Sequence, residues 1–422
     1  MDAEVTSSVH RSVEAIWRME SAKIIAVLAR MLRDVGRAEE LAQDALVTAL
    51  ERWPRDGVPE RPGAWLLTTA RNRALDELRH GKLVARTAEA LRGELEDAVA
   101  HAAPAEDALD DSIGDDLLRL IFIACHPVLA TEARVALTLR LLGGLTTDEI
   151  ARAFLQSEPT IAQRIVRAKR TLAEARVPFE IPRGEELAAR LSSVLEVIYL
   201  VFNEGYAATA GEDWMRPALC EEALRLGRIL AELVPGEPEV HGLVALMELH
   251  ASRLPARVAP NGEPILLLDQ ARARWDQLLI RRGLAALERA DALGGALGPY
   301  ALQAAVAACH ARAREPGDTD WVRIVALYDA LAQLAPSPVV ELNRAVAVSM
   351  AFGAAAALEI VAKLADEPRL AGYHLLPSVQ GDLLQKLGRR GEARVAFERA
   401  AALTRNARER ALLLERAASC GD

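Results

Sequence analysis

A run of cationic and amide side chains near the middle of this 422-residue sequence is the clearest candidate for a binding site. Such side chains donate hydrogen bonds to phosphate oxygens and base edges, which is what a helix in a DNA groove requires. The candidates are Pro159, Thr160, Gln163, Arg164, Arg167, Lys169 and Arg170. We expect Thr160 and Gln163 to reach base edges and the cations to contact phosphates. The alternative is an ordinary helix pair with a solvated, charged face.

A helix-turn-helix is the element that would position these side chains. Thr146 and Glu149 have the spacing of a capping box, which predicts a short helix through Phe154. A turn follows, and Pro159 then suits the first turn of a second helix, where its missing N–H costs nothing. In that helix the apolar residues Ile161, Ile165 and Leu172 share one face and are expected to point inward.

Two earlier helices are weaker candidates for binding. The predicted helix from Ala64 to Arg79 carries Arg71, Arg73 and Arg79, which could follow phosphates, and Trp65, which could stack on an unpaired base. Trp65 could equally be a core residue. The segment from Asp34 to Trp53 pairs an acidic, amide-bearing face with an apolar face, so it is either a partner-binding helix or a solvated surface helix.

Composition favours an all-α fold without a disulfide framework. Hydrophobic residues make up 51% and aromatic residues 4%, and the formal net charge is −9. Cys125, Cys220, Cys309 and Cys420 are scattered without a CxxC pair, so a zinc ribbon is not expected. The chain starts without a secretory signal pattern, and no apolar run is long enough for a membrane span, so we expect a cytoplasmic protein without membrane association.

Charge balance and helix-breaking residues divide the chain into four parts. Residues 12–80 are predicted to form a helical domain, and residues 81–116 a linker with 3 basic and 10 acidic residues. Residues 117–176 contain the helix-turn-helix and are basic, with 9 basic and 5 acidic residues, a balance suited to nucleic acid. Residues 177–422 show degenerate tetratricopeptide-like spacing, clearest at Gly381, Ala393, Phe397 and Ala400.

Three segments in this order resemble the sigma-70 family of transcription initiation factors, in its extracytoplasmic-function (ECF) group. They are RAEELAQDAL, AWLLTTARNRALDELR and LTTDEIARAFLQSEPTIAQRIVRAKR, and they cover about residues 12–176. The remainder, including LVFNEGYAAT, resembles a subgroup with a long C-terminal tetratricopeptide-like extension.

The resemblance implies partners and roles for individual residues. Core RNA polymerase, at its clamp coiled coil and flap region, and promoter DNA would be the partners. The clamp-binding residues would be Glu39, Glu40, Leu41, Gln43 and Asp44; Ala42 and Ala45 replace bulkier or polar residues common there. The −10 element would meet Trp65, Thr68, Arg71, Asn72, Arg73 and Arg79, and the −35 element the helix that starts at Pro159. No catalytic residue, cofactor or metal is implied.

Regulation is expected to lie in the extension. Asn203, Glu204 and Tyr206 are candidates for a regulatory pocket, or else part of a turn with a core tyrosine. We expect the repeats to pack on the sigma domains and to bind a regulatory protein or ligand. A one-component DNA-binding regulator and a repeat scaffold are the alternatives. An enzyme is the least supported class, because adjacent residues such as Cys125 and His126 point apart on a helix.

Overall fold

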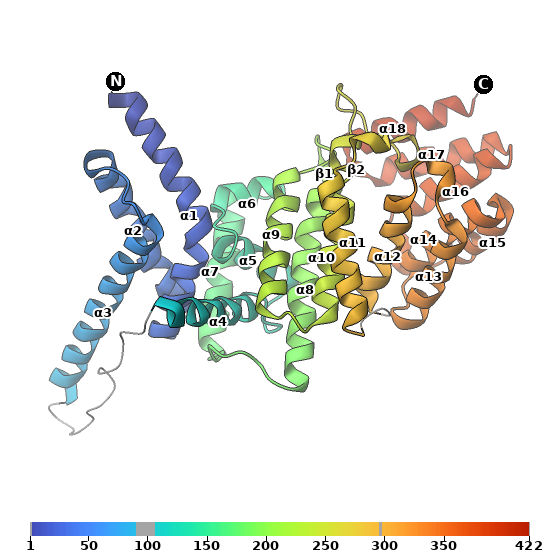
Figure 1. Ribbon diagram of the computed structural model, residues 1–422. Helices are drawn as coiled ribbons and strands as arrows, with labels where there is room; N and C mark the ends of the chain where they lie inside the picture. The colour runs from blue at the N-terminus through green and yellow to red at the C-terminus, as the bar shows by residue number, and fades with distance from the viewer. Residues whose placement is uncertain (1, 90–105, 295–297, 422) are drawn as a thin grey trace. The chain divides into compact units, whose positions relative to one another are not determined.

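The fold is all-α, as the composition predicted (Figure 1). The computed structural model describes residues 2–89, 106–294 and 298–421, and within them it has eighteen α-helices and two short strands. It divides into two compact units, Met1–Val197 and Ile198–Asp422. No helix in the described ranges has the length and apolar character needed to span a bilayer.

The first unit begins with three long helices. These are α1 (Asp2–Leu32), α2 (Val35–Asp56) and α3 (Pro62–Glu89), and each packs against the other two. Asp34 caps α2 by accepting the backbone N–H of Arg37 at 2.9 Å. Trp53 is buried on α2, and its ring contacts that of Trp65 on α3 edge-on, with the ring centroids 5.4 Å apart. These contacts fix the relative position of the two helices that were predicted to bind polymerase and the −10 element.

The second part of this unit contains the helix-turn-helix. It comprises α4 (Glu106–Ala124), α5 (Thr131–Leu141), α6 (Thr147–Ala153), α7 (Glu158–Glu174) and the first half of α8 (Glu185–Tyr206). The predicted capping box is present, since Thr146 accepts from the backbone of Glu149 at 3.1 Å and Glu149 accepts in return at 2.8 Å. Ile161, Ile165 and Leu172 of α7 are buried, as the periodicity predicted.

The acidic segment 81–116 contributes to helices at both of its ends. Residues 81–89 continue α3 and residues 106–116 begin α4, while residues 90–105 lie outside the described ranges. Asp116 is fully buried and forms ion pairs with Arg30 at 3.1 Å and with Arg119 at 2.7 Å. The C-terminal end of the expected linker is therefore part of a packed interface with α1.

The second unit is a succession of antiparallel helices. Its helices after α8 are α9 (Pro217–Leu233), α10 (Pro238–Ala251), α11 (Gln277–Ala292), α12 (Pro299–Arg312), α13 (Trp321–Leu334), α14 (Pro338–Phe352), α15 (Ala354–Leu364), α16 (Leu375–Lys386), α17 (Arg390–Leu403) and α18 (Ala407–Ser419). Successive helices pack on one another from α12 onward, which is the pattern of a helical repeat.

A short parallel bridge joins the two ends of this unit. Strand β1 (Ala210–Gly211) pairs with β2 (Arg405–Asn406), and the two lie beside each other in Figure 1. The buried Asn406 side chain also donates to the carbonyls of Ala208 at 3.0 Å and Asp213 at 2.8 Å. The segment after α8 is thus tied to the segment before α18.

The tetratricopeptide-like spacing near the C-terminus is confirmed by packing. Ala393, Phe397 and Ala400 of α17 are fully buried, and the Phe397 ring lies against Gly381 of α16. A Cβ atom at Gly381 would come within 2.7 Å of that ring, so only glycine fits there.

We expect Gly381→Ala to destabilise the second unit by about 1–3 kcal/mol, because overpacking forces the ring or the helices apart. Thermal unfolding measures the effect. Gly391→Ala on α17 is the matched control, since nothing lies within 4 Å of its Cβ position. Equal melting temperatures for the two variants would contradict the close packing of α16 on α17.

Candidate nucleic-acid interface

Four of the seven residues predicted to meet the −35 element line one hollow on the surface. The hollow has a volume of about 350 Å³ and lies between α7 and the start of α5. Thr160, Gln163, Arg164 and Arg167 contribute from α7, and the opposite wall includes Val128, Leu129, Ala130, Glu132 and Ala133. Gln163 and Arg167 are exposed and Arg164 is half-buried. This wall from α5 and the preceding turn was not predicted, because it packs beside α7 only in the folded chain.

The other three candidates on α7 lie elsewhere. Pro159 is exposed in the first turn, and Arg170 is exposed but paired with Glu174 one turn later, at 2.6 Å. Lys169 departs from the prediction, because its ammonium group forms an ion pair with Glu39 of α2. In this structure Lys169 is therefore turned toward α2, and the expectation that it shares the outward face of α7 is corrected.

Hydrogen bonds from α5 to α8 fix the position of the α5 wall of the hollow. Arg134 of α5 donates to Ser193 at 2.5 Å and to Glu196 at 3.0 Å, both on α8. Ser193 in turn donates to the carbonyl of Cys125 at 2.6 Å, and Arg190 donates to the carbonyl of Phe122 at 2.8 Å. The first half of α8 thus satisfies carbonyls at the end of α4, which have no partner within their own helix. The compact unit accordingly ends at Val197, beyond the expected boundary at residue 176.

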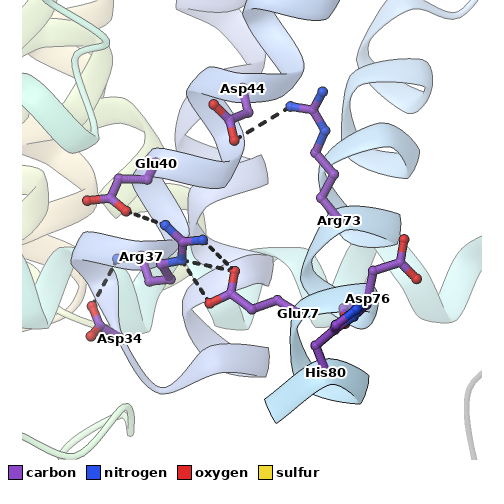
Figure 2. A network of polar contacts seen from close by, with 8 residues as sticks. All are labelled: Asp34, Arg37, Glu40, Asp44, Arg73, Asp76, Glu77 and His80. Atoms are coloured by element: carbon purple, nitrogen blue, oxygen red, sulfur yellow. Dashed lines mark hydrogen bonds and ion pairs between the residues drawn. The ribbon is translucent and has the colours of Figure 1, made fainter. Parts of the chain in front are cut away.

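A polar network joins α2 to α3 (Figure 2). Arg37 donates to both carboxylate oxygens of Glu77 at 2.8–2.9 Å and to Glu40 at 2.6 Å. These hydrogen bonds raise the pKa of Arg37 and lower the pKa of Glu77. Arg73 donates to Thr48 at 2.8 Å and lies 3.7 Å from Asp44. Arg73, predicted to meet the −10 element, is therefore bound to α2 in this structure.

The remaining −10 candidates lie mainly on one stripe of α3. Thr68, Asn72 and Arg79 are exposed, and their spacing puts them on the same side of the helix as Trp65. Trp65 is half-buried against Trp53, so it contributes to the packing of α2 on α3, while its stacking on an unpaired base stays a prediction. Arg71 is half-buried, and Arg79 lies 3.3 Å from Asp76.

The five clamp-binding candidates on α2 differ in exposure. Glu40 and Asp44 are exposed, and Leu41 is buried in the helical core. Glu39 is only 4% exposed, and Gln43 donates to it at 2.7 Å. Sequence periodicity predicted an acidic face here, but not that one of its carboxylates is covered by another part of the chain.

The predicted regulatory residues have structural partners within the second unit. Glu204 is buried and paired with Arg216, and it accepts from the Thr209 hydroxyl at 2.9 Å. Tyr206 lies beneath the guanidinium of Arg257, 3.5 Å from its ring centroid. Asn203 is exposed. The three residues lie at the C-terminal end of α8 rather than in a turn, and the regulatory pocket stays a prediction.

The environment of Cys125 and His126 does not suit nucleophilic chemistry. Burial raises the pKa of the Cys125 thiol to about 11, and its sulfur lies 3.3 Å from the Thr138 hydroxyl. Burial lowers the pKa of His126 to about 4, and its ring accepts the backbone N–H of Val128 at 3.1 Å. All four cysteines are buried and free. At neutral pH the thiol stays protonated, so Cys125 is a core residue.

Comparison with known proteins places these elements in a family. The sigma-70 region 2 family matches residues 16–84, and the sigma-70 region 4 family matches residues 119–172. The ECF RNA polymerase sigma factor SigK of Mycobacterium ulcerans (strain Agy99) is 33% identical over 156 residues, which are 36% of this chain and 78% of SigK. The chain belongs to the ECF group of sigma-70 factors. This sigma factor carries region 2 on α1–α3 and region 4 on α4–α7, as the three sequence segments indicated.

Two further relatives show how far the similarity extends. The probable ECF RNA polymerase sigma factor SigI of Mycobacterium tuberculosis (strain CDC 1551 / Oshkosh) is 29% identical over 259 residues, which are 56% of this sigma factor and 86% of SigI. The uncharacterized protein R00370 of Rhizobium meliloti (strain 1021) is 46% identical over 391 residues, covering 92% and 91% of the two chains. A family of unknown function, DUF6596, matches residues 190–291. The extension of this sigma factor therefore has a relative along almost its whole length.

Proposed function

We propose that this sigma factor binds core RNA polymerase through α2 and directs initiation at promoters that α3 and α7 contact. The family consists of non-catalytic transcription initiation factors, which supports a role without an enzymatic step. The observation that carries the DNA assignment is the hollow between α5 and α7. There Gln163, Arg164 and Arg167 present donors without a carboxylate partner among the described ion pairs. In such an interface the guanidinium groups bind phosphates, while Gln163 and Thr160 read base edges. The proposed place of action is the cytoplasm, where polymerase and promoters lie.

The C-terminal extension is proposed to regulate this activity through α8. The supporting contact is Arg134, which joins the wall of the DNA hollow to Ser193 and Glu196. A change in the extension that moves α8 would then alter the shape of the hollow. A partner or ligand on the repeats can drive such a change only if it binds the two arrangements with different affinity.

In vitro run-off transcription tests the proposed function. Sigma-free core polymerase with this protein and genomic fragments should give discrete transcripts, and neither component alone should do so. The competing function, a one-component regulator, predicts specific binding to duplex DNA without polymerase and no transcripts. Arg134→Ala in the same assay reports on the extension, and an unchanged yield would contradict regulation through α8.

A further inference from the structure

The carboxylate of Glu39 on α2 is enclosed by donors from three helices. Gln43 of the same helix donates to it at 2.7 Å, and Arg140 of α5 donates at 2.6 Å. Lys169 of α7 forms the third contact, an ion pair. We call these four residues the Glu39 cluster. Its two cations come from positions more than 100 residues later in the chain.

This arrangement is a specific one rather than a chance surface pair. The Glu39 side chain is 5% exposed, and those of Arg140 and Lys169 are each 21% exposed. A carboxylate buried to this degree is stable only when it is paired and hydrogen-bonded. Arg140 also donates to the carbonyl of Leu145 at 3.1 Å, directly before the helix-turn-helix. The backbone of α2 comes close as well, since a Cβ at Gly36 would lie 3.6 Å from Lys169 Cδ.

We propose that the Glu39 cluster is a docking surface that region 4 occupies within the chain and that core polymerase must take over. The inference rests on the proposed function, because it assumes that polymerase contacts this end of α2. While Arg140 and Lys169 cover it, the Glu39 side chain is only 5% exposed, so side chains of a partner cannot reach its carboxylate. The competing partner must therefore present its own arginine or lysine side chains to Glu39, beside the exposed carboxylates of Glu40 and Asp44.

Displacement has a second consequence, on the DNA side. Lys169 lies two residues after Arg167 and therefore on another side of α7, but once released from Glu39 its charge is no longer neutralised and adds to the positive field around this helix. Binding of a basic partner to α2 and binding of DNA to α7 then favour each other. Such coupling is reciprocal, so promoter DNA should also tighten the polymerase contact. While the Glu39 cluster is closed, both activities are reduced.

Arg140→Ala tests the proposal in the full chain, because Arg140 belongs to neither proposed binding surface. The variant should bind core polymerase about tenfold more tightly, since affinity rises with the fraction of molecules in the competent state. Arg140→Lys should restore part of the closed state. Arg152→Ala is the matched control: it removes the same charge from region 4, but its carboxylate partner, Asp148, lies on the same helix.

A measurement without polymerase separates this proposal from the proposed function. Dyes on Met19→Cys and Ala173→Cys, both exposed positions, report the separation of α1 and α7 by energy transfer, and the four native cysteines are buried. Lower transfer in Arg140→Ala than in Arg152→Ala supports the cluster, even if no polymerase binding is found for any variant. Unchanged transfer and unchanged polymerase affinity in a folded Arg140→Ala chain would overturn it. If Arg140→Ala fails to fold, Arg140→Gln carries the same comparison.

Discussion

Replacing Arg164 and Arg167 together by alanine is expected to weaken binding to duplex DNA by about 100-fold at low salt. Hydrogen bonds to charged groups are worth roughly 1.5–3 kcal/mol each, so each guanidinium contributes at least about tenfold. Both arginines line the hollow between α5 and α7, and neither has a carboxylate partner among the described ion pairs. The slope of log affinity against log salt concentration should also become shallower by about two units, one for each lost phosphate contact.

Fluorescence anisotropy with a random-sequence duplex, over a series of salt concentrations, measures both quantities. Arg394→Ala is the control, since it removes one exposed arginine from α17, where the partner is Glu398 at 3.0 Å. It should leave affinity and slope nearly unchanged. Should the double variant keep the parent's affinity and slope while remaining folded, α7 does not contact DNA phosphates.

The second unit is expected to lose much of its stability between about pH 6.5 and pH 4, because it buries neutral histidines. Burial lowers the pKa of His310 to about 3 and lowers the pKa of His250 well below its ordinary value. The nearby cations Arg253 and Arg272 act in the same direction on His310. In the unfolded chain these rings titrate near pH 6.5, so below that pH the unfolded state binds more protons. The stability that each neutral ring contributes is therefore present above pH 6.5 and is lost as the pH falls, by about 2 kcal/mol for His310 at pH 5.

Thermal unfolding at about pH 7.5 and about pH 5 tests this expectation, and His310→Gln isolates one ring. The fall in Tm on acidification should be smaller for the variant than for the parent chain, by roughly 4–8 °C. The relevant quantity is the difference between the two pH values, so a general destabilisation by the substitution does not obscure it. His80→Gln, at an exposed position on α3, should behave as the parent. An identical pH response of His310→Gln and the parent would show that this ring is not held neutral.

The elements of the first unit were predictable from the sequence because their signals are local. The capping box at Thr146 and Glu149 and the apolar spacing of Ile161 and Ile165 depend only on near neighbours, and the structure has both features. The order of three such segments was enough to indicate the family. The tetratricopeptide-like spacing at Gly381 is a local signal of the same kind, because Gly381 packs on Phe397 of the next helix along the chain.

The features that escaped prediction depend on partners that are distant in the sequence. Lys169 and Arg167 are both cations of α7, but they lie two residues apart and so on different sides of the helix, and the partner of Lys169, Glu39, is distant in the sequence. Glu204 was a candidate for a pocket because its partner, Arg216, comes only after an intervening turn. The role of α8 in region 4 was missed for the same reason, since the carbonyls that it satisfies belong to α4.

The bridge between β1 and β2 changes how the second unit should fold and unfold. An open helical repeat has only neighbour contacts, so it can lose a terminal helix and keep the rest. Here Ala210 pairs with Arg405, a contact between residues almost 200 positions apart. Closing so long a loop costs entropy that is recovered only when the intervening helices are in place. The chain from β1 to α18 should therefore unfold as one cooperative block, and removing α18 with β2 should loosen the segment after α8 as well as the C-terminal end.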